Sequence, residues 1–203
     1  VRADSPDIEE YLSNFGVQAN GQSPSDIQTA VLKSSGIFPI AFQNTTIAYS
    51  PALSDVFTRF GNGYIDFSFI VKTEFNSKRR FDQCGIVMYL NSENWLKASI
   101  EYENNEYQRL GSVVTNKGYS DWATTDIEAS IKSMWYRLSR RESDYCIECS
   151  TDGINFRQMR ICHMTEGANE IKFGIYACSP ENSSFEAAFS NIEITECRWL
   201  EHK

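Results

Sequence analysis

The most constraining feature of this sequence is a two-residue alternation of apolar and polar side chains, which begins near residue 61. In GYIDFSFIVKTEF, for example, Ile65, Phe67, Phe69 and Val71 share one side. The later runs of this kind are QCGIVMYL, WLKASIEYE, EYQRLGSVVT, MWYRLSRRE, DYCIECS, NFRQMRIC, IKFGIYAC and SFEAAFSNIEIT. Asn, Asp and Gly residues punctuate them every 8–12 residues or so, which is typical of an antiparallel all-β sandwich or barrel.

The first 60 residues give a weaker signal. DIEEYLSNFG and SPSDIQTAVLKSS each fit a short helix or a strand. Residues Ser23 to Asp26 suit a helix start, whereas the alternation of Ile27, Thr29 and Val31 suits a strand. We favour strands here, because the sheets need partners for their edges.

The length, composition and net charge of the chain limit the class of protein. A chain of 203 residues is expected to form one domain over residues 1–203, and 41% hydrophobic residues suffice for a core. A formal net charge of -8 argues against binding to nucleic acids or anionic membranes, because both need a basic patch. The most apolar run, GIFPIAF, is too short to cross a bilayer and contains Pro39. The chain begins at Val1, so we expect a trimmed or processed end, with a removed signal peptide still open.

Six cysteines raise the alternatives of disulfides, metal binding and free thiols. Because the chain is long and apolar enough to fold without disulfides, we expect reduced, buried cysteines and a cytoplasmic location. Cys146 and Cys149 have the spacing of zinc ligands, with Cys162 and His163 downstream. Residues three apart on a strand point to opposite faces, so the sequence predicts no metal site here.

Two acidic residues offer a possible catalytic pair. Glu101 and Glu103 are two apart on a predicted strand and therefore share a face at about the separation used by retaining glycosidases. The segment EYENNE is similar to the E-x-D-x-x-E signature of laminarinase-like hydrolases. However, its middle acid is Glu, and the turn predicted at Asn104-Asn105 would remove Glu106 from the acidic face. Neither a nucleophile elbow nor a phosphate-binding glycine loop occurs.

A polar and aromatic face on the same strand is the strongest binding candidate. Trp95, Lys97, Ser99, Glu101 and Glu103 alternate with residues 96, 98, 100 and 102, which we expect to point inward. Neighbouring hairpins could add Tyr89, Ser112 and Arg137. Aromatic rings stack on sugars while charged groups bond their hydroxyls, although a solvated charged surface is the alternative.

Two turns carry further aromatic residues. In VVTNKGYSDW, Trp122 follows the turn at Gly118, and we expect it in a loop that folds over the end of the sheet. There it would either cap the core or form a wall of the binding groove. The Asp152-Gly153 turn is expected to be structural, with Phe156 packed beneath it.

Several segments together resemble a known family. DQCGIVMYLNSENWLKASIEYE, SVVTNKGYSDW, WYRLSRR, STDGINF and KFGIYACSP, in that order, resemble a concanavalin A-like jelly-roll family of unknown function, of the regulation-of-enolase type. The resemblance is strongest over residues 81–195, and the N-terminal 50 residues do not match. It implies a two-sheet antiparallel β-sandwich of the lectin and glucanase type with a concave face, and no established activity. The positions that match its motifs are Asp82, Gln83, Gly85, Trp95, Lys97, Glu101, Thr115, Ser120, Asp121, Trp122 and Arg137.

Three functions follow as hypotheses. The first is a non-catalytic module that holds a carbohydrate or polyol in the concave face and needs no cofactor. Its ligand-binding candidates are Trp95, Lys97, Glu101, Trp122, Arg137, Asp121 and Gln83. The second is a sandwich-type glycoside hydrolase that uses Glu101 and Glu103. The third is an intracellular regulatory domain that binds a protein partner through its acidic surface.

Overall fold

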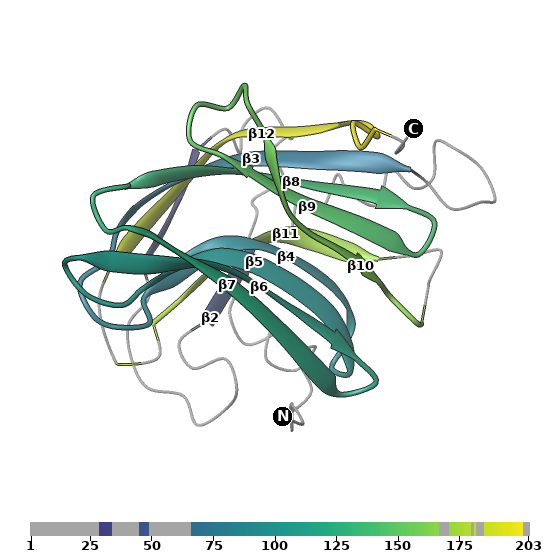
Figure 1. Cartoon of the computed structure of the whole chain (residues 1–203), viewed down its shortest axis with the longest axis horizontal. Helices are drawn as coiled ribbons and strands as arrows, with labels where there is room; N and C mark the ends of the chain where they lie inside the picture. Colours follow the sequence, from purple (N-terminus) through teal and green to yellow (C-terminus); the bar gives the residue numbers. More distant parts are fainter. Residues whose placement is uncertain are drawn as a thin grey trace.

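Two antiparallel six-stranded sheets pack face to face in a β-sandwich (Figure 1). The structure is a computed structural model and describes residues 29–33, 45–48, 66–166, 171–179, 181 and 185–200. Within these ranges no helix is long and apolar enough to cross a membrane. The strands are β1 (Thr29–Lys33), β2 (Thr45–Ala48), β3 (Phe67–Asn76), β4 (Gln83–Asn91), β5 (Asn94–Tyr102), β6 (Tyr107–Asn116), β7 (Tyr119–Glu128), β8 (Ser133–Arg141), β9 (Asp144–Ser150), β10 (Arg157–His163), β11 (Lys172–Cys178) and β12 (Glu186–Glu196).

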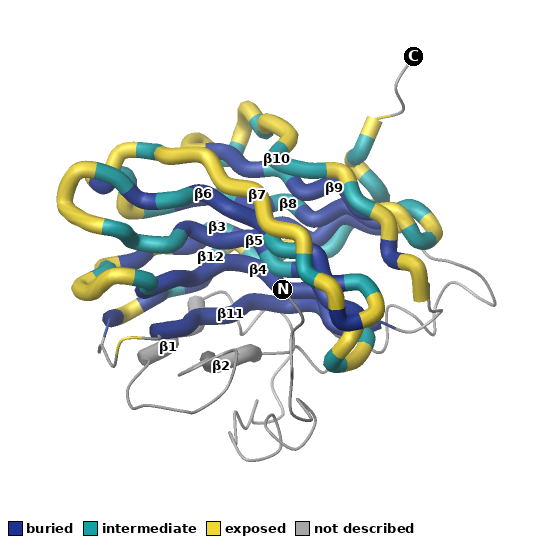
Figure 2. The backbone as a smooth tube through the Cα atoms, turned by 60° about the horizontal axis from the view of Figure 1, so that its bottom comes forward, coloured by how far each residue is buried: buried dark blue, intermediate teal, exposed yellow. Residues whose placement is uncertain are grey.

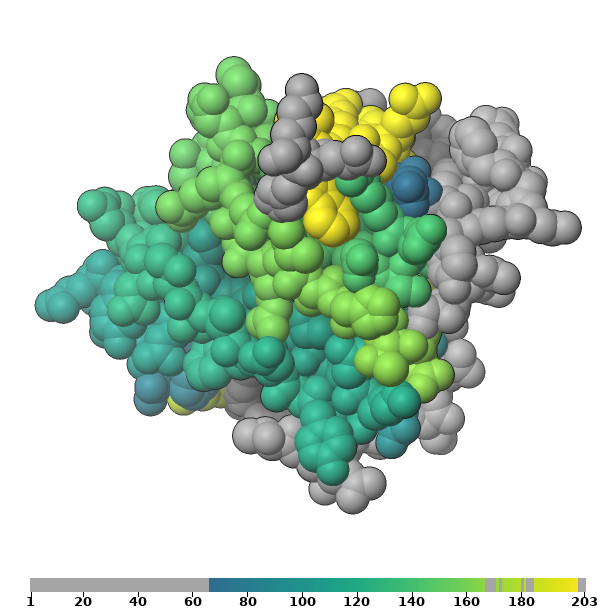
Figure 3. Space-filling model, turned by 45° about the vertical axis from the view of Figure 1, so that its right-hand side comes forward, coloured from purple at the N-terminus to yellow at the C-terminus, as the bar shows by residue number. Residues whose placement is uncertain are grey.

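The order of strands in each sheet mixes near and distant segments. The first sheet runs β1-β12-β3-β8-β9-β10, and the second runs β2-β11-β4-β5-β6-β7. Tight hairpins join β4 through β7, whereas β11 reaches β4 and β12 reaches β3 only through long-range pairing. As a result β7 and β10 are edge strands on the same side of the sandwich, the side that Figure 3 shows.

Alternation builds the core between the sheets, as predicted. Phe67, Phe69 and Val71 are 0–2% exposed, and residues 96, 98 and 100 of β5 are equally buried. Phe173 of the second sheet stacks on Phe67 with ring centroids 4.5 Å apart and meets Phe69 edge-on at 5.3 Å. Burial of such rings is the main favourable contribution to folding in a domain of this kind.

The predicted turn at Gly118 is the two-residue loop of a β-hairpin. Its central residues, Lys117 and Gly118, have φ angles of 51° and 78°, and two positive values are typical of a type I′ turn. Tyr119 to Trp122 therefore begin strand β7. The expectation that they form a loop over the end of the sheet was wrong, since the type I′ geometry starts the return strand immediately.

Local hydrogen bonds hold the Asp152-Gly153 turn, and its packing partner differs from the one expected. Asp152 accepts hydrogen bonds from the backbone N–H groups of Ile154 and Asn155, both at 2.8 Å. A Cβ atom at Gly153 would lie 2.7 Å from the Trp135 ring, so this ring packs beneath the turn. Phe156, which was expected there, instead contacts Arg137, with the guanidinium carbon 4.3 Å from the ring centroid.

All six cysteines have free thiols, four of them buried. Cys146 and Cys149 occupy opposite parities of β9, and no group of three or more potential metal ligands occurs among the described residues. The run around Val31 is a strand, β1, as favoured. DIEEYLSNFG lies outside the described residues.

At Gly85, strand β4 lies too close to the backbone of β5 to leave room for a side chain. A Cβ atom there would lie 1.9 Å from the carbonyl oxygen of Ala98 on β5, and a backbone atom has little room to move. We therefore expect Gly85→Ala to lower the free energy of unfolding by about 2–3 kcal/mol in urea titrations. Gly118→Ala is the control, because its site is open and only the positive φ is costly, about 1–2 kcal/mol. A Gly85→Ala variant as stable as wild type would contradict this account.

Candidate ligand-binding face

The outer face of the second sheet, which points away from the first sheet, carries the polar row predicted on β5. Trp95, Lys97, Ser99 and Glu101 lie on this face, opposite the core residues of the same strand. In the sheet register, Glu101 is flanked by Gln83 on β4 and by Arg109 on β6. Figure 2 shows this side of the molecule, with β7 exposed and the central strands largely buried.

Trp95 lies on the predicted face but is not available for stacking. Its side chain packs with Tyr89 and Val113 in a small apolar cluster separate from the main core. Trp95 is only 5% exposed. Trp95 therefore packs against neighbouring side chains at one end of the polar row and offers no open ring surface to a ligand.

Gln83 links the two charged residues at the centre of the face. Its Oε1 accepts a hydrogen bond from Lys97 Nζ and another from the Tyr176 hydroxyl at 3.2 Å. Its Nε2 donates to Glu101 Oε2 and to the Phe81 carbonyl, both at 3.3 Å. The network fixes the orientation of the amide and holds an ammonium and a carboxylate in adjacent positions.

Burial shifts the proton affinities of this pair toward each other. Loss of solvation lowers the pKa of Lys97, while the nearby thiol of Cys178 and the carboxyl of Glu101 oppose the shift. Loss of solvation raises the pKa of Glu101, and the charges of Lys97 and Arg109 partly offset this effect. Burial is the largest cause of both shifts, so the two groups share a poorly solvated part of the outer face.

Trp122 provides an exposed aromatic surface beside this pair. Its side chain crosses Gly111 on β6, where an added Cβ atom would lie 3.4 Å from the indole nitrogen. Trp122 is nevertheless 55% exposed, and the guanidinium carbon of Arg109 lies 5.9 Å from its ring centroid. Gly111 therefore lets the ring lie close to the sheet while one side of it stays open to solvent.

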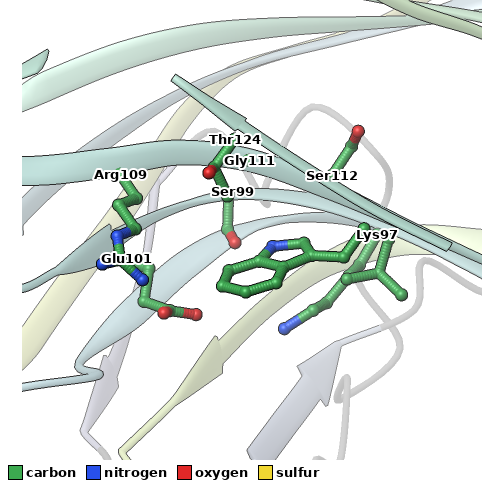
Figure 4. A pocket seen from close by; sticks show the side chains of 9 residues that line it. Lys97, Ser99, Glu101, Arg109, Gly111, Ser112 and Thr124 are labelled. Carbon is green, nitrogen blue, oxygen red and sulfur yellow. The ribbon is translucent and has the colours of Figure 1, made fainter. Parts of the chain in front are cut away.

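These side chains surround a shallow hollow. Figure 4 shows Arg109 and Glu101 at one end and Lys97 at the other, with Ser99 and Gly111 between them. The hollow has a volume of only about 10 Å³, enough for about one water molecule. A larger ligand would have to lie across the face instead of entering it.

Glu103 lies just beyond the end of β5 and is held by two arginines. Arg80 Nη2 is 2.5 Å from Glu103 Oε1, and Arg109 Nη2 is 3.7 Å from Oε2. The loop that carries Arg80 is anchored by the buried carboxylate of Asp82, which accepts hydrogen bonds from two backbone N–H groups and from Ser179. Glu103 is thus charge-paired on both oxygens.

The structure brings together Gln83, Lys97, Glu101 and Trp122 but not two other candidates. Arg137 lies on β8 of the first sheet, where it forms a two-bond ion pair with Glu148 at 2.6 and 2.7 Å. Asp121 has the opposite parity to Trp122 on β7, and its carboxylate meets Arg160 of β10 at 2.7 Å.

Sequence reasoning missed Arg109 and Tyr176. Arg109 alternates with the apolar Leu110 in EYQRLGSVVT, so the sequence indicates that its side chain points to the polar face of a strand. Its position opposite Glu101, however, depends on the β5–β6 register. Tyr176 reaches Gln83 because β11 pairs with β4 across a long sequence separation. No local signal indicates that pairing.

The two sheets form an antiparallel β-sandwich, a fold that this chain shares with a legume lectin-like domain and with GH43 proteins. The family model described as "Protein of unknown function (DUF1349)" matches residues 37–197, and the chain belongs to that family.

Known proteins resemble this chain in sequence or in fold. "Regulation of enolase protein 1" of Saccharomyces cerevisiae is 28% identical over 125 residues, which is 62% of this chain and 62% of the relative. The crystal structure of a functionally unknown protein from Saccharomyces cerevisiae has a TM-score of 0.61 at 23% identity and covers 84% of this chain and 97% of that chain. A legume lectin-like domain from Entamoeba histolytica has a TM-score of 0.52 at 12% identity, covering 87% and 94%. The GH43 BlXynB protein from Bacillus licheniformis has a TM-score of 0.57 at 16% identity, covering 83% of this chain and 33% of that chain.

The coupling between Lys97 and Glu101 is directly measurable. Lys97→Met removes the strongest influence that lowers the pKa of Glu101, so this pKa should rise further. A raised pKa means that the folded state holds the proton more tightly than the unfolded state. The stability that this proton contributes is present below the usual carboxyl pKa and is lost as the pH rises through the raised value. NMR titration of the Glu101 carboxyl carbon checks the shift, and an unchanged or lower pKa in the variant would show that the two groups do not interact.

Proposed function

We propose that this protein is a non-catalytic binding module for a carbohydrate or polyol, which lies across the outer face of the second sheet. The observation that carries the proposal is the Trp122 ring, which lies close to Gly111 with more than half of the residue exposed, beside Lys97, Glu101 and Arg109. An aromatic face stacks on the C–H groups of a sugar ring. The neighbouring carboxylate and cations then bond its hydroxyls in a direction-dependent way.

The shallow form of the site supports a chain-like or ring-edge ligand. With a hollow of about 10 Å³, the face offers a surface and no enclosed chamber. Because Lys97, Gln83 and Glu101 are already hydrogen-bonded to one another, they are pre-oriented, and little side-chain entropy is lost on binding.

The state of Glu103 favours binding over hydrolysis. A retaining glycosidase needs one free carboxylate as nucleophile and one protonated acid. Glu101 fits the acid by its raised pKa, but Glu103 is paired with Arg80 and Arg109. Such pairing stabilises a carboxylate in its resting state and lowers its nucleophilicity.

The fold neighbours are consistent with this proposal. The solved structures that share the sandwich include a legume lectin-like domain, GH43 proteins and an alginate lyase. Their names refer to lectins and to enzymes of glycan degradation, so the fold is one that occurs with carbohydrate ligands.

A second candidate is a protein-binding regulatory role, which the name of the yeast relative suggests. The edge strand β7 is exposed along nearly its whole length and would be the natural contact surface. Sedimentation of this chain with purified enolase tests the idea, because co-sedimentation supports it and independent boundaries contradict it.

Trp122→Ala tests the carbohydrate proposal. We expect it to abolish binding to soluble xylan, xyloglucan, laminarin or alginate, whichever the wild type binds, as measured by affinity electrophoresis. Because the side chain is exposed, the free energy of unfolding should stay within about 0.5 kcal/mol of wild type.

Trp135→Ala is the matched control. This indole packs beneath Gly153 on the first sheet, so its removal should cost about 2 kcal/mol of stability and leave glycan binding intact. If the wild type binds none of the four polymers, or if Trp122→Ala binds as well as wild type, the proposal is wrong.

A further inference from the structure

A second cavity opens where the edge strands β7 and β10 of the two sheets diverge, on the side shown in Figure 3. It has a volume of about 160 Å³. Its lining from the second sheet includes Leu110, Ser112, Ala123 and Thr125, and its lining from the first sheet includes Cys149, Arg157, Gln158 and Met159. Ser112 and Thr124 line both this cavity and the hollow beside Trp122, whereas Trp122, Lys97 and Glu101 line only the hollow and Arg157 and Met159 line only the cavity.

The two edges are joined at one end of this cavity and apart along its length. Arg160 Nη2 meets Asp121 Oδ2 at 2.7 Å, and Asn116 bonds the backbone of His163 and Thr165 at 2.9 Å each. The pairing of β10 with β9 also contains a bulge between Gln158 and Arg160, in the cavity wall. Bulges bend a strand and redirect side chains, so this separation of the edges is built into the strand.

The lining combines an apolar floor with one arginine, Arg157, whose guanidinium is held in place by a hydrogen bond. Leu110, Met159 and Cys149 are apolar or weakly polar and belong to the core or pack against it. Arg157 Nε donates to Cys149 Sγ at 3.4 Å, which fixes the plane of the guanidinium at the wall. In the described part of the chain Arg157 forms no ion pair, so its terminal nitrogens can donate to an anion.

We propose that this cavity is a binding site for a small organic carboxylate with an apolar body about the size of a benzene ring. A cavity of about 150 Å³ is known to hold benzene, so the volume fits such a body. The guanidinium of Arg157 would take the carboxylate in two parallel hydrogen bonds, and the hydroxyls of Ser112 and Thr125 lie in the same lining. Inorganic phosphate would make no apolar contact with the floor of the cavity, and a purely apolar ligand would form no hydrogen bond with the guanidinium of Arg157.

Benzoate is the test ligand, with neutral benzamide as its near-isosteric control. In NMR titrations of the wild-type protein, benzoate should shift the signals of Ala123, Thr125 and Met159 saturably and bind about tenfold more tightly than benzamide. Arg157→Gln should reduce benzoate to the affinity of benzamide. Arg198→Gln makes the same charge change at a residue that pairs with Glu193 outside the cavity, and it should bind benzoate as the wild type does.

A filling variant separates the cavity from a general effect of charge. Ala123→Leu adds three carbon atoms to the wall and should abolish benzoate binding while the thermal midpoint holds or rises. The proposal is overturned if benzoate produces no saturable shifts at the lining residues, if benzamide binds wild type equally well, or if both Arg157→Gln and Ala123→Leu bind benzoate normally.

Discussion

The alternation of side chains along β5 is the constraint on which both the core and the candidate site depend. Leu96, Ala98 and Ile100 point into the sandwich and are almost fully buried, while Lys97 and Glu101 point outward. A shift of the strand by one residue would exchange these faces. The ammonium and the carboxylate would then enter the core, at a desolvation cost that a marginally stable domain could not meet.

Two glycines turn this outer face into a site. Gly85 lets β4 and β5 approach more closely than any Cβ atom allows, and Tyr176 reaches Gln83 from β11 beside it. Gly111 leaves the sheet surface clear for the indole of Trp122. Backbone geometry thus decides where the aromatic rings lie, and the rings in turn limit solvent around Lys97 and Glu101. The shifted pKa values of that pair follow from burial that the sheet itself creates.

Local patterns predicted the strands and the face of β5, because alternation and turn chemistry act over a few residues. The turn at Gly118 and the inward direction of Ile100 are examples, although the sequence did not indicate that a strand follows this turn at once. The composition of the site depends on which strands are neighbours, and that order is set by long-range pairing. The sequence does not show which sheet each strand joins, and Arg137 was therefore wrongly assigned to the site. Its strand, β8, belongs to the other sheet. Arg109 was missed because its place beside Glu101 follows from the β5–β6 register.

The central claim is that ligand stacks on the one tryptophan that is both exposed and on the outer face of the second sheet. The four indole N–H signals of the protein, from Trp95, Trp122, Trp135 and Trp199, resolve this in a single NMR titration with a bound glycan. The account predicts that the Trp122 signal shifts saturably and by far the most, while those of Trp135 and Trp199 stay in place. A dominant shift at Trp135 or Trp199, or an unmoved Trp122 signal at saturation, would contradict it.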